Sequence, residues 1–151
     1  MKTIFGLLLA ISAIVTAGGK PTLSPLSGKT REDIQAGYGN RLHPVLHVER
    51  MHTGVDIDVP EGTPVVATAP GRVLTAEKTE GYGLLVVIQH PDGYMTKYAH
   101  LSKLDVRKGQ NVVSGATVGR SGNTGESTRE HLHYEVWKNG KPVDPAAYFP
   151  Q

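Results

Sequence analysis

The apolar residues of this chain come in short runs separated by turns, and this pattern limits the folds open to it. The 151 residues include 18 glycines and 10 prolines, which fall between the runs. In residues 54–59 valine and isoleucine alternate with glycine and aspartate, which is the period of a half-buried strand and not of a helix. The sequence therefore predicts an all-β, mainly antiparallel domain with hardly any room for helix.

The clearest strand signal is EHLHYEVW, residues 130–137, which is followed by the hairpin dipeptide Asn139-Gly140. Alternate residues of a strand point to one face, so His131 and His133 project side by side, about 6.6–6.8 Å apart. The alternate apolar residues then face a core. One histidine could bind a metal while the other reaches a water on that metal. A pair of surface histidines is the alternative.

A second pair of candidate ligands is His52 and Asp56, which the period of two places on the same face of one extended segment. An imidazole and a carboxylate are good zinc ligands, and a third protein nitrogen would leave one position open for water. Asp58 points the same way and is a competing carboxylate. On its own, a histidine four residues before an aspartate is a weak signal.

A fourth candidate histidine lies in the middle of the chain. Residues 84–90 form an almost continuous apolar run, which predicts a buried central strand. Pro91-Asp92-Gly93 turns it into a strand over residues 94–101, near whose end His100 lies. A lone histidine in such a position is usually solvated or caps the strand.

Charge and cysteine content exclude several classes of protein. A net charge of +2 with scattered lysines and arginines does not favour nucleic-acid binding. The chain has no cysteine, so it has neither disulfides nor thiolate metal ligands.

The first residues are typical of a secretory signal peptide. A lysine precedes an apolar run over residues 4–15, and Val15-Thr16-Ala17 offers small residues for cleavage. The run is shorter than the roughly 20 residues of a membrane span, although an uncleaved anchor is the alternative. We expect a signal peptide over 1–17, an extended lead-in over 18–33 rich in Pro, Ser and Gly, and a single domain over 34–151. The protein is then exported to the periplasm, or to the cell wall and the extracellular space.

Taken together, H-x-x-x-D at 52–56, Y-A-H-L at 98–101, the loop SGNTGEST at 121–128 and H-L-H at 131–133 form an ordered set. In this respect the sequence resembles the lysostaphin-like (LytM-type) zinc endopeptidases of bacterial cell walls. The resemblance covers about residues 38–148. It implies a small curved β-sheet domain with an open groove, which cleaves peptide cross-links of peptidoglycan.

The resemblance also implies roles for individual residues. His52, Asp56 and His133 correspond to the ligands of one Zn²⁺ per chain, and His131 and His100 to the catalytic histidines beside the metal-bound water. No H-E-x-x-H motif supplies a glutamate base, and an imidazole pKa near 6.5 suits proton transfer. We expect His131 to be the general base and His100 to orient the water or stabilise the developing oxyanion, although these roles could be exchanged.

The chain departs from the family at several positions. Arg129 and Glu130 stand where relatives usually have a small residue and often proline, and we expect both to line or overhang the groove. Some relatives use a tyrosine shortly before the first ligand. Residues 40–51 contain no tyrosine, so that role is unfilled or falls to His43, His47 or Arg50.

The element RLHP at residues 41–44 resembles relatives from Gram-negative envelopes and indicates D,D-endopeptidase action on direct cross-links. Two other classes remain as alternatives. One is a catalytically silent relative that binds the wall or regulates an amidase. The other is a biotinyl or lipoyl carrier, a class that needs a lysine in a Met-Lys context at a hairpin tip. This sequence lacks that feature. We expect a monomer without a stable membrane anchor, whose partner is peptidoglycan.

Overall fold

The structure is a computed structural model that describes residues 18–42 and 46–151. The expected signal peptide and His43 lie outside the described residues. In the described part the regular elements are strands and short 3-10 helices, which confirms the all-β prediction. No helix in these two ranges has the length and apolarity needed to cross a membrane.

The strands are β1 (Gly39–Leu42), β2 (Glu49–His52), β3 (Val55–Ile57), β4 (Pro64–Val66), β5 (Gly71–Thr79), β6 (Gly83–Gln89), β7 (Tyr94–Leu101), β8 (Lys103–Leu104), β9 (Asn111–Val112), β10 (Thr117–Arg120), β11 (Leu132–Lys138) and β12 (Lys141–Val143). The 3-10 helices are η1 (Arg31–Asp33), η2 (Pro91–Gly93) and η3 (Pro145–Tyr148).

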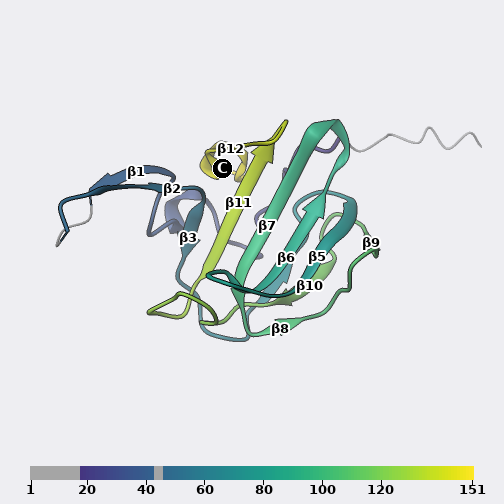
Figure 1. Ribbon diagram of the computed structural model, residues 1–151. Helices are drawn as coiled ribbons and strands as arrows, with labels where there is room; N and C mark the ends of the chain where they lie inside the picture. The colour runs from purple at the N-terminus through teal and green to yellow at the C-terminus, as the bar shows by residue number, and fades with distance from the viewer. Residues whose placement is uncertain (1–17, 43–45) are drawn as a thin grey trace, which may run out of the picture.

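One antiparallel sheet dominates the molecule. Its strands follow the order β12-β11-β7-β6-β5-β9, and β3 pairs with the beginning of β11. Figure 1 shows β11, β7, β6 and β5 lying side by side. A smaller sheet has the order β4-β10-β8, and β1 and β2 form a separate ribbon that extends to one side (Figure 1).

The turns follow the local sequence closely. Between β11 and β12, Asn139 and Gly140 both have positive φ, 50° and 78°, which is the hairpin geometry that Asn-Gly favours. The turn η2 joins β6 to β7 with Asp92 and Gly93 at φ of 63° and 77°. The central strands predicted over 84–90 and 94–101 are therefore confirmed as β6 and β7.

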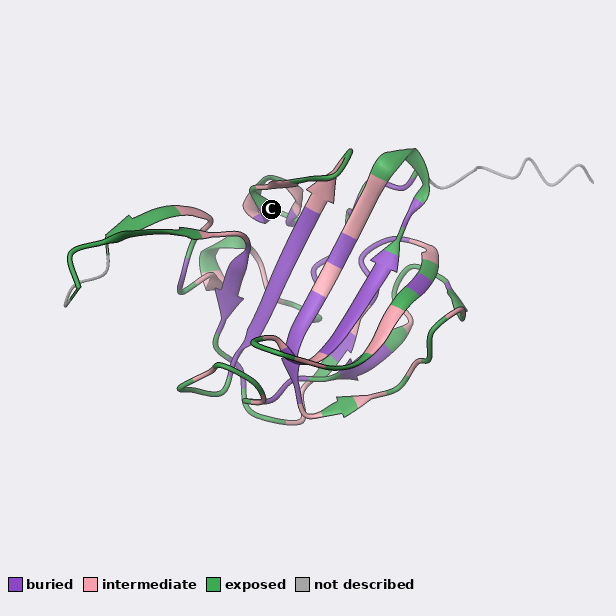
Figure 2. Ribbon diagram, in the orientation of Figure 1, coloured by how far each residue is buried: buried purple, intermediate pink, exposed green. Residues whose placement is uncertain are grey.

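The larger of two core clusters lies on one face of the main sheet. Leu132, Tyr134 and Val136 of β11 are at most 1% exposed and belong to one cluster with Val86 and Tyr98. Figure 2 shows β6 and β11 buried over most of their length. Because strand residues alternate, this packing turns His133 and Glu135 toward the other face of β11.

Residues of the expected lead-in pack against this domain. Leu26 is 1% exposed and belongs to the core cluster. The Thr22 N–H donates to the Thr68 carbonyl at 3.1 Å, and the Val66 N–H donates to the Pro25 carbonyl at 2.9 Å. The segment therefore contributes to the packing of the domain, while a boundary at residue 33 stays a prediction.

Residues 52–56 do not form the single extended segment that their alternation predicts. β2 ends at His52 and β3 begins at Val55, so the chain bends at Thr53-Gly54. A Cβ on Gly54 would lie 2.3 Å from the Tyr134 carbonyl oxygen. Glycine therefore allows β3 to approach β11 closely, and the bend carries His52 back toward Asp56.

Candidate metal and active site

The four histidines and one aspartate that the sequence singled out lie around one open cavity. It has a volume of about 470 Å³, and its walls include His52, Asp56, His100, His131 and His133. Strand pairing explains this convergence, because β11 lies between β3 and β7. His133 is opposite Asp56 on one side and Ala99, the neighbour of His100, on the other.

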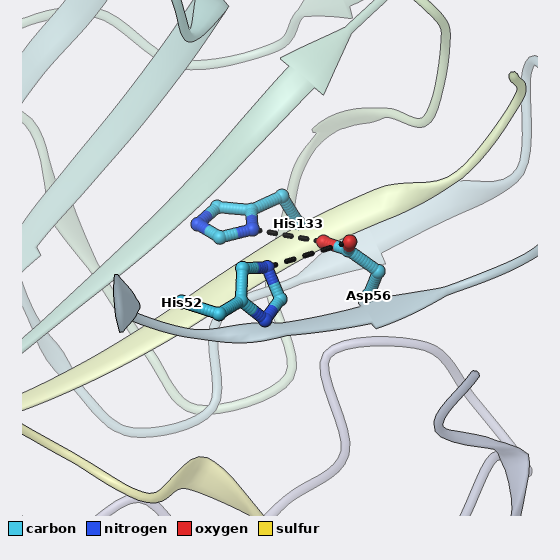
Figure 3. Close-up of side chains that lie close together, drawn as sticks. All are labelled: His52, Asp56 and His133. Carbon is cyan, nitrogen blue, oxygen red and sulfur yellow. Dashed lines mark hydrogen bonds and ion pairs between the residues drawn. The ribbon is translucent and has the colours of Figure 1, made fainter. Parts of the chain in front are cut away.

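Three side chains of this set offer ligand atoms to one point. The carboxylate of Asp56 lies between two imidazoles, with Oδ1 2.8 Å from His133 Nδ1 and Oδ2 3.4 Å from His52 Nε2 (Figure 3). One ligand atom from each residue lies within 4.8 Å of the other two. The spacing and the donor types suit a tetrahedral cation that keeps one position for a non-protein ligand.

Hydrogen bonds at the far side of each ring fix which nitrogen faces this point. His52 Nδ1 lies 2.8 Å from the Gly37 carbonyl, which can only accept, so Nδ1 carries the proton and Nε2 has the free lone pair. His133 Nε2 donates to Glu135 Oε2 at 2.8 Å, which leaves Nδ1 toward Asp56. Both rings are therefore oriented as metal ligands before any metal binds.

The other two histidines are held in the same way. His100 Nδ1 donates to the Thr124 carbonyl at 2.8 Å, and His131 Nδ1 donates to the Arg129 carbonyl at 2.7 Å. Their ring centroids are 4.9 Å apart, and His131 Nε2 lies 3.7 Å from Asp56 Oδ1. Each ring therefore presents an unprotonated Nε2 to the cavity when it is neutral.

In the absence of metal, the electrostatics of the site favour a negatively charged Asp56 beside a positively charged His133. Burial raises the pKa of Asp56, but hydrogen bonds from His133 and His52, and their charges, hold it well below its usual range. Burial lowers the pKa of His133, but its hydrogen bonds with Asp56 and Glu135 raise it to about 9. A metal ion must therefore displace a proton from His133 Nδ1. Burial also lowers the pKa of His100, against the hydrogen bond to Thr124.

Glu135 is a candidate site residue that the sequence interpretation missed. Its side chain is fully buried and accepts hydrogen bonds from His133 Nε2, Tyr82 OH, Trp137 Nε1 and Thr53 Oγ1 at 2.8, 2.8, 2.7 and 3.1 Å. Burial raises the pKa of Glu135, but the hydrogen bond and charge of His133 lower it below its usual value. The signal was present, because Glu135 follows His133 by two residues on the same strand face.

The residues that depart from the family pattern have different places. Arg129 lines the cavity as expected, but Glu130 is exposed and is not among the described residues that line it. Of the two residues, Arg129 is therefore the one that lines the cavity, and the prediction that Glu130 overhangs the groove stays a prediction. His47 and Arg50 are exposed on or beside the ribbon and do not line the cavity, and His43 lies outside the described residues.

Asp58, the competing carboxylate, is not in the ligand group. Its Oδ1 accepts a hydrogen bond from Arg129 Nε at 2.7 Å. The register of β3 against β11 explains the choice, since Asp56 is the residue directly opposite His133.

Comparison with known proteins agrees with this geometry. The chain is 48% identical over 104 residues to the peptidoglycan DD-endopeptidase ShyA of Vibrio cholerae. That match covers 69% of this chain and 24% of ShyA, so the chain spans about a quarter of the relative's length.

Two solved structures share the fold. A zinc-containing peptidase from Vibrio cholerae superposes with a TM-score of 0.78 at 37% identity, over 86% of this chain and 39% of that one. The catalytic domain of lysostaphin from Staphylococcus simulans gives 0.68 at 32% identity, over 78% and 93% of the two chains. The lysostaphin-like fold inferred from the sequence motifs is thus confirmed.

Residues 50–145 match Peptidase family M23, and this range contains all five candidate site residues, His52, Asp56, His100, His131 and His133. With a match over more than half of its length, the chain belongs to Peptidase family M23.

Proposed function

We propose that this chain is a zinc-dependent endopeptidase that hydrolyses peptide cross-links of bacterial peptidoglycan, of the D,D-endopeptidase type. The observation that carries the proposal is the convergence of His52, Asp56 and His133 in an open cavity beside two further oriented histidines. The name of the Vibrio cholerae relative, a peptidoglycan DD-endopeptidase, supports the substrate class.

The metal would be held by His52 Nε2, the Asp56 carboxylate and His133 Nδ1, one ion per chain. A zinc ion with these ligands would lower the pKa of a bound water to about 7 and polarise the scissile carbonyl. Glu135 holds the His133 ring by accepting from Nε2, and Gly37 does the same for His52. These contacts keep the ligand nitrogens aimed at one point.

His131 is the better candidate for the general base. Its Nδ1–H is engaged by the Arg129 carbonyl, so Nε2 takes the proton of the attacking water and later passes it to the leaving amine. The imidazolium formed in between lies 3.7 Å from Asp56 Oδ1 and is attracted by that charge.

His100 suits a different role. Because burial lowers its pKa, its ring stays neutral, and its Nδ1–H is engaged by the Thr124 carbonyl. The free Nε2 can therefore accept a hydrogen bond from the attacking water but cannot donate one to an oxyanion. We infer that His100 orients the water.

The cellular setting is part of the same proposal. A signal peptide over 1–17 and a peptidoglycan substrate imply export to the periplasm, or to the cell wall and extracellular space, where we expect the protein to be a monomer. A catalytically silent relative is not favoured, because both candidate catalytic histidines lie beside the ligand group.

The test is digestion of purified peptidoglycan sacculi by the chain from Gly18 onward, with and without a zinc chelator. Released fragments are identified by mass. Loss of cross-linked dimers that the chelator prevents, and that His131→Ala and His133→Ala both abolish, would support an endopeptidase and identify its bond. Unchanged sacculi from a folded, zinc-loaded protein would contradict the proposal.

A further inference from the structure

Arg129 brings a guanidinium group to the wall of the cavity from the loop before β11. Its Nη2 lies 4.0 Å from Asp56 Oδ2, and its backbone carbonyl accepts from His131 Nδ1. One residue therefore lies against both the candidate metal-binding carboxylate and the candidate base.

Arg129 differs in the sign of its charge from the carboxylate side chains that line the cavity. The charged lining residues are Asp56, Glu80, Glu126 and Arg129. Among the described lining residues, Arg129 is the one with a permanent positive charge. An anionic group on a substrate is repelled by Glu80 and Glu126 and is attracted by the fixed positive charge of Arg129.

Asp58 orients the guanidinium of Arg129 through Nε and leaves its other N–H donors available. It accepts from Nε at 2.7 Å, and its own N–H donates to Gln35 Oε1 at 2.7 Å. Within residues 18–42 and 46–151, no group accepts a hydrogen bond from Nη1. Because the two side chains are 46% and 43% exposed, such a pair adds little to stability. Its consequence is an oriented guanidinium with free donors, the arrangement that binds a carboxylate.

We propose that Arg129 determines specificity by binding a carboxylate of the peptide substrate next to the scissile bond, and that Asp58 is its positioning residue. This inference rests on the proposed function and adds to it the chemical feature that the site selects. It also gives a role to Arg129, one of the residues at which the sequence departs from the pattern expected from the resemblance.

The test uses two cross-linked peptides that differ only in whether the residue beside the scissile bond carries a carboxylate or a carboxamide. We expect the wild-type enzyme to favour the carboxylate by about 10- to 100-fold in kcat/KM, the range of a charge-assisted hydrogen bond. Arg129→Gln should cleave both equally, and Arg129→Lys, which keeps the charge without the planar fork, should retain part of the preference. Asp58→Asn should fall between Arg129→Gln and the wild type.

The matched control is Arg72→Gln, which removes an exposed positive charge on β5 outside the cavity and should leave the preference unchanged. Zinc content and circular dichroism verify that Arg129→Gln keeps its metal and its fold. Calorimetric binding of both peptides gives a readout that does not depend on cleavage.

The outcomes separate the inference from the function. Equal kcat/KM and equal affinity of the wild type for the two peptides, or an unchanged preference in Arg129→Gln, would overturn the role of Arg129 while the endopeptidase stands. Tighter binding of the carboxylate peptide that Arg129→Gln abolishes, without cleavage of either peptide, would support the role of Arg129 and contradict the proposed function.

Discussion

Glu135 gives the sharpest test of how the protein prepares its candidate metal site. The carboxylate is fully buried and uses both oxygens, since Oε2 accepts from His133, Tyr82 and Thr53 while Oε1 accepts from Trp137. Glu135→Gln must therefore turn its amide nitrogen toward donors on one side or the other. The less costly choice faces the nitrogen toward Trp137 and keeps an oxygen for His133.

The size of the effect follows from that choice. Removing the partner of a metal-binding histidine typically weakens metal binding by about 10- to 100-fold. Glu135→Gln keeps the His133 hydrogen bond and loses only its charge, so we expect about a 10-fold weaker zinc affinity, or about 1.4 kcal/mol. Glu135→Ala leaves the His133 ring unsupported, and we expect about 100-fold.

The assay is competition for zinc against a chromophoric chelator, at a pH where both proteins are folded by circular dichroism. Glu77→Gln is the matched control, because Glu77 is exposed on β5 and does not line the cavity. If folded Glu135→Ala binds zinc as tightly as the wild type, the reasoning that Glu135 holds the ligand is refuted.

Other predictions concern zinc, backbone approach and pH. Zinc at about 1,000 times its Kd should stabilise the chain by about 4 kcal/mol, and thermal unfolding of His52→Ala should show no such gain. Gly54→Ala should lower the free energy of unfolding, measured with denaturant, by about 1–3 kcal/mol, because its Cβ would meet the Tyr134 carbonyl. The control Gly37→Ala, with no atom within 4 Å of its Cβ, should leave that free energy nearly unchanged. His90 Nδ1 donates to the Pro70 carbonyl, and burial lowers the pKa of His90. The folded state therefore keeps the His90 ring neutral, whereas in the unfolded state the ring takes up a proton below pH about 6.5. As pH falls below that value, the wild type should lose up to about 1.4 kcal/mol per pH unit relative to His90→Gln, and parallel stability curves for the two proteins would contradict this.

Local signals in the sequence predict the strands well. The alternation in residues 130–137 and the Asn139-Gly140 turn give β11 and its hairpin, because both depend on neighbouring residues alone. The same reasoning misjudged residues 52–56, where alternation suggests one strand. There the close approach of Gly54 to β11, a contact with a segment 80 residues later in the chain, decides the bend.

The candidate site depends on contacts that no local pattern contains. Asp56 and Asp58 are equivalent by alternation, and only the register of β3 against β11 separates them. The family resemblance selected Asp56 without that register. Glu135 lay within reach of the period-two argument, but its role becomes visible only with the donors from Thr53 and Tyr82, which come from other strands and loops.

The most direct test of the account is a crystal structure of the zinc-loaded protein with anomalous diffraction measured at the zinc edge. We expect one peak per chain, about 2.0–2.2 Å from His52 Nε2, an Asp56 oxygen and His133 Nδ1, with its remaining position open toward His131 and His100. A peak bound by Asp58 or by His131, or a fourth protein ligand that closes the site, would contradict the central claim.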